Sequence, residues 1–419
     1  MKHDKGLLDR SFWAEKILPL AIEYGIYLYI LLMFAGKFGT FREIGLYAPP
    51  VLWLTGCLIK GNFDLQWREP VFICLIIFSL SAVISSFFSV SPVDSFIFFK
   101  KEHLKILLLY IVVSTAFAHA KKLNRLATFL ALTGILYLVS GWYRISEDLL
   151  IAGSINYEAL RNYATIFIFF LPFIILKTIE AERLERIFWL IPLIGSFTGI
   201  LVIGVRGSWL ALFGIFCIWM FTSKSKFQGY SIIFKTSIAF VIISILIITV
   251  FLLFPVQYKL VKDHSSQKIQ LLLRFEAWEN FLKMSGRRFL FGHGLDDRAM
   301  SEHYRAFYKS IKGDYPTEEK PTTPHNQFIK ISYQQGIVGL ASYLSLLSVV
   351  LIRIIKRFYI DNLTWFSFIG IAIVSVMIGE YVIRCLTEDR SLVPVGILIG
   401  MAGAFLSLKN RNDYHLSSS

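Results

Sequence analysis

Long apolar runs separated by short polar segments form the main pattern along this chain. Most runs hold about 16 to 25 residues, which is what an α-helix needs to cross about 30 Å of hydrocarbon at about 1.5 Å per residue. We therefore expect an all-α membrane protein with about twelve transmembrane helices. The predicted spans are 17–35, 44–60, 70–88, 104–119, 123–143, 163–179, 187–204, 208–223, 232–254, 327–352, 363–383 and 391–408.

One long polar segment interrupts the rhythm of short loops. This segment covers residues 255–325. Predicted helices 1 to 9 precede it within residues 1–254, and helices 10 to 12 follow it within residues 326–408. A short tail, residues 409–419, comes after the last helix. A loop of this length in a compact membrane domain is usually functional. Its apolar residues recur every three or four positions, which predicts a helix whose apolar face lies on the membrane domain or at the interface: Leu271, Leu272, Phe275, Trp278 and Leu282.

The distribution of positive charge predicts the orientation of these helices. With the amino terminus in the cytoplasm, the inner segments carry twice as many Lys and Arg residues as the short outer loops. Inner loops are enriched in these residues in membrane proteins. We therefore expect both termini in the cytoplasm and the long loop on the outer side.

Composition excludes several other classes of protein. Hydrophobic residues make up 55% of the chain and charged residues 17%, too little polar surface for a soluble protein of this size. The net charge of +14 is scattered among short loops, so it does not indicate nucleic-acid binding. The sequence contains neither metal-ligand spacing nor a D-x-D motif. We expect no metal and no cofactor.

Two arginines on the outer side are candidate ligands for an anion. Arg206 lies in a tight Gly-Val-Arg-Gly hairpin between two apolar runs, and Arg274 lies on the predicted loop helix four residues before Trp278. An arginine held near lipid is costly unless it is paired or faces a polar cavity. Its planar fork grips a phosphate with two parallel hydrogen bonds. The alternatives are a snorkelling anchor for Arg206 and a solvated ion pair with Glu276 or Glu279 for Arg274.

His325 stands directly before an apolar run, at the outer mouth of a predicted helix. An imidazole exchanges a proton near neutral pH, and a helix start favours an anion. The alternative is a helix cap formed by Asn326, with His325 only exposed. A separate pair, Glu380 and Arg384, is four residues apart on a predicted helix, so the two side chains should bind each other.

Taken together, these motifs resemble the O-antigen ligase family and its superfamily of O-antigen polymerases. The resemblance covers most of the chain: about twelve spans, a large loop before the tenth, and five short motifs in a fixed order. The motifs are Arg206-Gly207, Arg274 to Trp278, Gly292-His293-Gly294, Pro324 to Phe328, and Gly336 to Leu340.

The resemblance implies a GT-C type fold in the bacterial inner membrane, with a periplasmic loop and active site. It implies transfer of glycan from undecaprenyl diphosphate-linked O-antigen to the lipid A core, with inversion and without a metal. Arg206 and Arg274 would stabilise the diphosphate leaving group, and His325 would activate or orient the acceptor hydroxyl. Further contacts to donor or acceptor are expected from Arg288, Trp278, Asn326 and Arg161.

Three functions remain open at this point. The first is the ligase, which the size of the loop favours by analogy. The second is a polymerase or protein O-glycosyltransferase of the same superfamily. The third is a transporter of lipid-linked oligosaccharide, which would require polar, broken segments at mid-membrane, whereas the exceptional residues here gather at one face.

Overall fold

A computed structural model of the chain describes residues 12–63, 65–148, 150, 157–222, 264–313, 322–360, 367–386, 388–389 and 391–408. These residues form helices joined by short turns, and this part of the chain contains no strand. The all-α class is thereby confirmed.

The helices before the long loop are η1 (Trp13–Ile17), α2 (Leu18–Leu32), α3 (Gly39–Lys60), α4 (Pro70–Phe87), α5 (Pro92–Phe99), η2 (Lys100–Leu104), α6 (Lys105–Ala116), α7 (Ala120–Glu147), α8 (Tyr157–Glu180), α9 (Arg183–Ile203) and α10 (Arg206–Thr222). Those in and after it are α13 (His264–Arg287), α14 (Asp297–Lys312), α15 (Gln327–Ile360), α16 (Ser367–Val376), η5 (Met377–Ile383), η6 (Arg384–Leu386) and α17 (Val393–Ser407).

Eleven of the twelve predicted spans fall on helices, and the span 232–254 lies outside the described residues. Six described helices are long and apolar enough to cross a membrane: Pro70–Phe87, Ala120–Glu147, Leu160–Glu180, Arg183–Ile203, Gln327–Phe358 and Phe368–Leu386. Two shorter apolar helices, Gly207–Trp219 and Val393–Ser407, add to them. The total of twelve spans and the GT-C type fold stay predictions.

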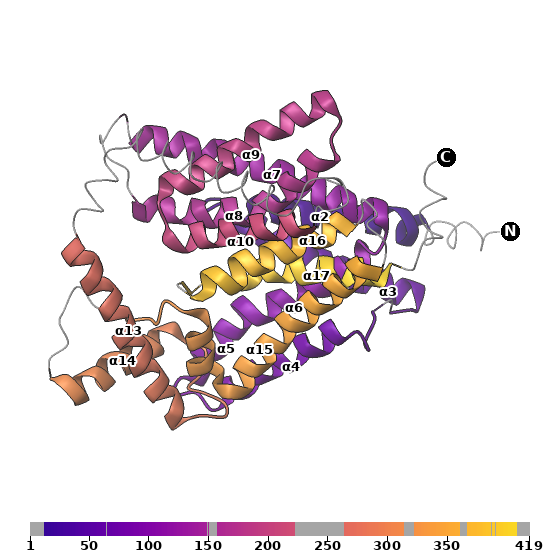
Figure 1. Cartoon of the computed structure of the whole chain (residues 1–419). Helices are drawn as coiled ribbons and strands as arrows, with labels where there is room; N and C mark the ends of the chain where they lie inside the picture. Colours follow the sequence, from indigo (N-terminus) through magenta and orange to yellow (C-terminus); the bar gives the residue numbers. More distant parts are fainter. Residues whose placement is uncertain are drawn as a thin grey trace.

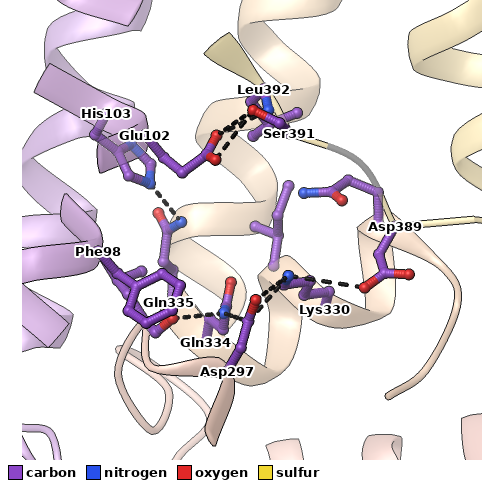
Figure 2. A pocket seen from close by; sticks show the side chains of 13 residues that line it. Phe98, Glu102, His103, Asp297, Lys330, Gln334, Gln335, Asp389, Ser391 and Leu392 are labelled. Atoms are coloured by element: carbon purple, nitrogen blue, oxygen red, sulfur yellow. Dashed lines mark hydrogen bonds and ion pairs between the residues drawn. The ribbon is translucent and has the colours of Figure 1, made fainter. Parts of the chain in front are cut away.

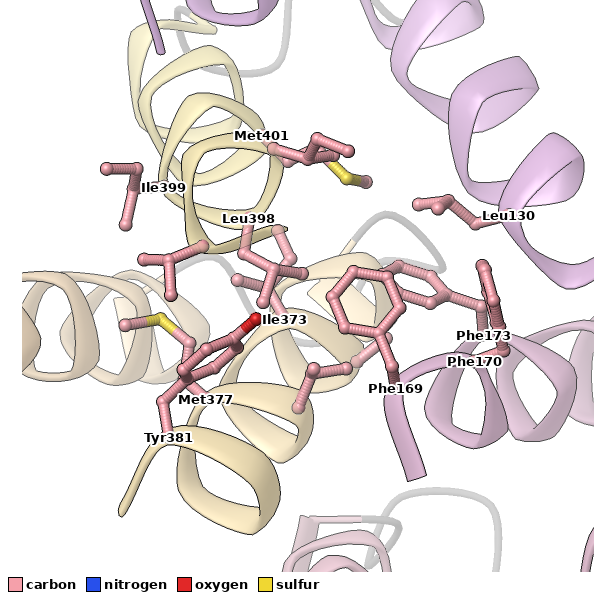
Figure 3. Packing of buried hydrophobic residues seen from close by; sticks show 14 of the residues in the cluster. Leu130, Phe169, Phe170, Phe173, Ile373, Met377, Tyr381, Leu398, Ile399 and Met401 are labelled. Carbon is pink, nitrogen blue, oxygen red and sulfur yellow. The ribbon is translucent and has the colours of Figure 1, made fainter. Parts of the chain in front are cut away.

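The apolar helices pack into a bundle around one large core. Figure 3 shows side chains of α7, α8, α16, η5 and α17 meeting at its centre, among them Phe169, Met377 and Leu398. Other large apolar side chains point outward, as Leu136 and Ile352 do with exposed fractions of 59% and 62%. Outward apolar side chains on helices of this length match a lipid environment rather than water.

Helices α13 and α14 lie together at one end of the bundle, opposite the end at which the first described helix begins (Figure 1). They share a small core of their own, in which Phe281 stacks on Tyr304 with ring centroids 4.6 Å apart. This core also holds Tyr333 of α15, which ties the pair to the bundle. Two members of the apolar face predicted for the loop helix, Phe275 and Leu282, are exposed and do not belong to this core, and their placement at the membrane interface stays a prediction.

In place of that face, α13 turns Ala277, Phe281 and Met284 inward, at spacings of four and three residues. The exposed fractions of Phe275 and Leu282 are 51% and 53%. The spacing of apolar residues predicts the helix correctly, but it does not determine which of the two adjacent apolar stripes packs against α14 and α15.

Helix α15 is broken at Gly336, where φ is 66° and ψ is −165°. The turn after α13 supplies the backbone partners that the break leaves open. His293 and Gly294 donate to the carbonyls of Tyr333 and Gln334, at 2.9 and 3.0 Å. In the other direction, Ile337 N–H donates to Phe289 O at 2.8 Å, and Val338 N–H to Leu290 O at 3.4 Å. Non-helical backbone near a membrane is stable where protein groups satisfy it, as they do here.

Two glycines allow the turn after α13 and the break in α15 to pack closely against each other. A Cβ at Gly336 would collide with the Leu290 carbonyl, and a Cβ at Gly292 with the Gln334 carbonyl. Both residues also have positive φ, 66° and 70°, a region that side chains disfavour. The Gly-x-Gly turn and Gly336 therefore form one joint between the turn after α13 and the break in α15.

Candidate active site

Four segments that are far apart in the sequence meet at the end of the bundle next to α14. They are the helix through η2, the start of α14, the first turns of α15, and the residues just before α17. Lys330 of α15 stands between them: its Nζ lies 2.9 Å from a carboxylate oxygen of Asp297 and 3.8 Å from Oδ2 of Asp389 (Figure 2). Because its side chain is only 15% exposed, the ammonium needs these two carboxylates to offset the loss of water.

Asn326 is the cap of α15. Its Oδ1 accepts hydrogen bonds from the backbone N–H groups of Phe328 and Ile329, at 3.0 and 3.1 Å, which satisfies two of the donors that a helix start leaves open. Its Nδ2 donates to the carbonyl of Leu386 at 3.0 Å. The cap therefore also fixes α15 against the end of η6.

His325 precedes this cap in an unusual backbone conformation, with φ at 46°. Such a φ is uncommon outside glycine and needs support from its surroundings. Part of that support comes from Trp278, whose indole N–H donates to the carbonyl of Pro324 at 2.6 Å. The imidazole Nδ1 lies 3.4 Å from Oδ1 of Asp389. The strained segment thus points an imidazole at a carboxylate.

Asp389 is the charged partner of both His325 and Lys330. Burial acts to raise the pKa of its carboxyl, but the interactions with His325 and with the ammonium of Lys330 outweigh it and lower the pKa to about 2. The carboxylate is therefore ionised throughout the physiological range. An ionised carboxylate beside one ring nitrogen orients the imidazole of His325.

A row of buried charges supports the segment that carries Asp389. Arg384 is fully buried; its guanidinium lies 2.9 Å from Glu380 and 2.7 Å from Glu388. The second oxygen of Glu388 lies 3.1 Å from Nε of Arg161 on α8. The predicted pairing of Glu380 with Arg384 is confirmed. Glu388 is fixed by two arginines, so the next residue, Asp389, is presented toward α15.

A cavity with a volume of about 180 Å³ lies beside Lys330. Its lining is mostly polar and comes from all four segments: Phe98, Glu102, His103, Leu295, Asp297, Gln327, Lys330, Ile331, Gln334, Gln335, Asp389, Ser391 and Leu392. Figure 2 shows the carboxylate of Glu102 accepting from Ser391 and from the N–H of Leu392. No group of three or more His, Cys, Asp or Glu side chains that could hold a metal ion occurs among the described residues.

The three arginines expected near the donor occupy different places. Arg206 is the first residue of α10, after Gly204 has ended α9 with φ at 75°; its side chain lies outside the described part of the structure. Arg274 lies on α13, partly buried, one helical turn before Trp278. Arg288 donates to the carbonyl of Phe88 at the end of α4. The joint use of Arg206 and Arg274 as a diphosphate clamp stays a prediction.

The central part of the chain matches a known family. Residues 191–344 match the family model described as O-antigen ligase. This segment includes Arg206, α13, α14 and His325, and it ends within α15. This part of the chain, a little over a third of its length, is similar to the O-antigen ligase family. No curated protein matches it.

The match to the O-antigen ligase family model and the long apolar helices both indicate a membrane protein. The matched segment stops before Asp389 and begins after Glu102. Part of the site therefore lies outside the region that carries the family signature.

Sequence reasoning missed the partners that surround His325. Four residues were not singled out as its partners or as lining of the cavity: Asp389, Lys330, Asp297 and Glu102. A signal existed for Lys330, since a lysine one turn into an apolar run is uncommon and calls for a partner. Nothing in the sequence indicated which carboxylates would supply it.

Proposed function

We propose that this chain is an O-antigen ligase that transfers O-antigen polysaccharide from undecaprenyl diphosphate to the lipid A core, at the periplasmic face of the bacterial inner membrane. The observation that carries the proposal is the pairing of His325 with Asp389 beside a polar cavity, at the end of the bundle where α13 and α14 lie. The match to the family model supports the reaction class, and the positive-inside pattern supports the orientation.

The proposed reaction is a single displacement at the anomeric carbon of the donor. The acceptor hydroxyl gives its proton to His325 as its oxygen bonds to that carbon, and the bond from carbon to the diphosphate oxygen breaks. Because Nδ1 of His325 faces Asp389, Nε2 is the nitrogen available to the hydroxyl. Asp389 stabilises the imidazolium that forms. One displacement inverts the anomeric configuration.

The leaving diphosphate takes the electron pair of the broken bond and gains negative charge. Arg206 and Arg274 would stabilise it, because fixed cations facing a developing charge in a water-poor site lower the barrier. The substrate contacts expected of Trp278 and Asn326 stay a prediction, and both residues also have a supporting role. Their hydrogen bonds hold the segment on which His325 sits.

The test of catalysis compares two neighbouring residues. In transfer from lipid-linked glycan to purified lipid A core, His325→Ala should lower the rate by about 10² to 10⁴, the usual contribution of a positioned base, with unchanged expression. Asn326→Ala removes a cap and should lower stability by about 0.5 to 2 kcal/mol. Activity of the His325→Ala protein near that of wild type would remove His325 from the mechanism.

Ligase and polymerase are separated by the lipopolysaccharide of a deletion strain. Loss of all O-chains with accumulation of lipid-linked polymer indicates the ligase. Lipopolysaccharide capped with single repeat units indicates the polymerase instead. Unchanged banding together with loss of glycan from a protein would indicate a protein O-glycosyltransferase.

A further inference from the structure

The cavity beside Lys330 is chemically different from the surroundings of the expected diphosphate clamp. Among the residues that the structure describes, no arginine lines it, and the one lining cation, Lys330, is already held by Asp297 and Asp389. A third acidic side chain, Glu102, lies across the cavity (Figure 2). Even with Glu102 protonated, two carboxylates outnumber one ammonium. A diphosphate would meet net negative charge here, so the donor's phosphates belong elsewhere.

The lining suits a ring that carries several hydroxyl groups. Three amide side chains line the cavity: Gln327, Gln334 and Gln335. Gln334 donates to Leu295 O and to Asp297, and Gln335 accepts from Ser81 and pairs with His103, so these two amides are held in fixed positions at the cavity. The carboxylates add acceptors. The ring of Phe98 adds one apolar wall. Ligand sites typically combine such an apolar surface with a few fixed polar groups. The volume of about 180 Å³ equals the share of roughly six water molecules in the liquid, at about 30 Å³ each, which is enough for one small polar ring.

A buried polar atom at the cavity still lacks a partner. His103 is only 4% exposed; its Nε2 pairs with Gln335 at 3.2 Å, but its Nδ1 has no hydrogen-bond partner among the described residues. A buried nitrogen without a partner is uncommon, and a missing ligand or water is one of the few explanations. This observation is independent of the charge count.

We propose that this cavity binds the acceptor sugar, and that it admits a neutral or amine-bearing ring while rejecting a carboxylated or phosphorylated one. The identification of this sugar as the acceptor rests on the proposed function. The cavity meets the catalytic pair at Asp389, which lines it and contacts His325. A ring bound there would therefore lie next to the pair of His325 and Asp389.

Binding of simple sugars to the purified full-length protein tests this without any donor. The probes are the methyl glycosides of glucose, glucosamine and glucuronic acid, followed by saturation-transfer NMR. Wild type should bind the first two and bind the glucuronide at least about tenfold more weakly, because a like charge placed next to buried carboxylates is strongly unfavourable. Asp297→Asn removes one negative charge, so it should reduce the ratio between the affinities for the glucoside and the glucuronide about tenfold.

The matched control is Glu43→Gln, which removes a carboxylate paired with Lys105 at 2.8 Å but not lining the cavity; it should leave this ratio unchanged. Asp389→Asn serves as a second charge-removing variant if Asp297→Asn does not insert. Equal binding of all three glycosides, no binding of any, or a ratio that neither aspartate variant changes would overturn the inference.

The outcome is separable from that of the proposed function. Sugar binding with the expected charge preference but no glycan transfer would count against the ligase alone. Transfer that proceeds normally while the cavity variants leave sugar binding unchanged would count against the cavity alone.

Discussion

Replacing Asp389 by Asn tests whether the carboxylate works through His325. At 3.4 Å, the attraction between an imidazolium and a carboxylate is about 1.2 kcal/mol in bulk water and about 5 kcal/mol at an effective dielectric constant of about 20. Since about 1.36 kcal/mol corresponds to tenfold in rate, kcat should fall between about tenfold and several thousandfold. Lys330 lies 3.8 Å from the same carboxylate and offsets part of its charge, so we expect about 10- to 10²-fold.

The assay is steady-state transfer by the purified protein, with kcat and KM measured separately. The carboxylate acts on the imidazolium that forms in the transition state, so Asp389→Asn should lower kcat and leave KM within about twofold of the wild-type value. A purely structural role would lower the yield of folded protein instead, or would raise KM as well.

Asp297→Asn is the control for indirect effects. It removes the other carboxylate of Lys330, at 2.9 Å, and leaves the contact of His325 with Asp389 intact. Its kcat should stay close to that of wild type. If both variants lower kcat equally, or if Asp389→Asn keeps the wild-type kcat, the reasoning is refuted.

Three further predictions concern the clamp, the joint and acid stability. Arg206→Lys and Arg274→Lys keep a charge but lose the two-pronged geometry, so each should cut transfer at least about tenfold; near-normal transfer by both favours simple anchoring. Gly336→Ala should lower the free energy of unfolding by more than about 2 kcal/mol, because the residue has a positive φ and the added Cβ would collide with the Leu290 carbonyl. The control is Gly61→Ala, which has the same φ of 66° but open space around it and should lower the free energy of unfolding by about 1 kcal/mol. Burial lowers the pKa of His293, helped by nearby positive charge, so the unfolded state binds more protons than the folded state below about pH 6.5. The free energy of unfolding should therefore be highest above that pH and decrease below it, by up to about 1.4 kcal/mol per pH unit. His293→Gln should make this decrease with falling pH smaller.

The helices could be predicted well because each depends on its own segment. The span expected at 70–88 is a helix at Pro70–Phe87, since an apolar run of this length has few alternatives in lipid. Helix α14 was not predicted, although its signal was present. Asp296 caps it by accepting from the N–H of Arg298 at 2.9 Å, and Met300, Tyr304 and Phe307 recur at helical spacing.

The pairings within the site depend on the tertiary fold and could not be predicted in the same way. Glu380 and Arg384 were correctly paired because four residues on one helix fix their separation. His325 and Asp389 are more than sixty positions apart, and only the packing of α15 against η6 brings them together. Asn326 shows both cases: its cap is local and was anticipated, whereas its bond to Leu386 was not.

The break in α15 explains why short motifs scattered along the sequence act as one set. The helical segment before Gly336 carries Lys330 and follows directly on His325, and it is offset from the membrane-crossing segment by the non-helical residue. The turn around His293 closes that break by four backbone hydrogen bonds, and the same turn leads into Asp297 at the start of α14. The joint therefore fixes the distance between Asp297 and Lys330 through backbone, not only through their charges. The same backbone hydrogen bonds that satisfy the polar groups at the break also position the residues on one side of the cavity. They therefore make the site rigid enough to hold His325 in its strained conformation beside the cavity.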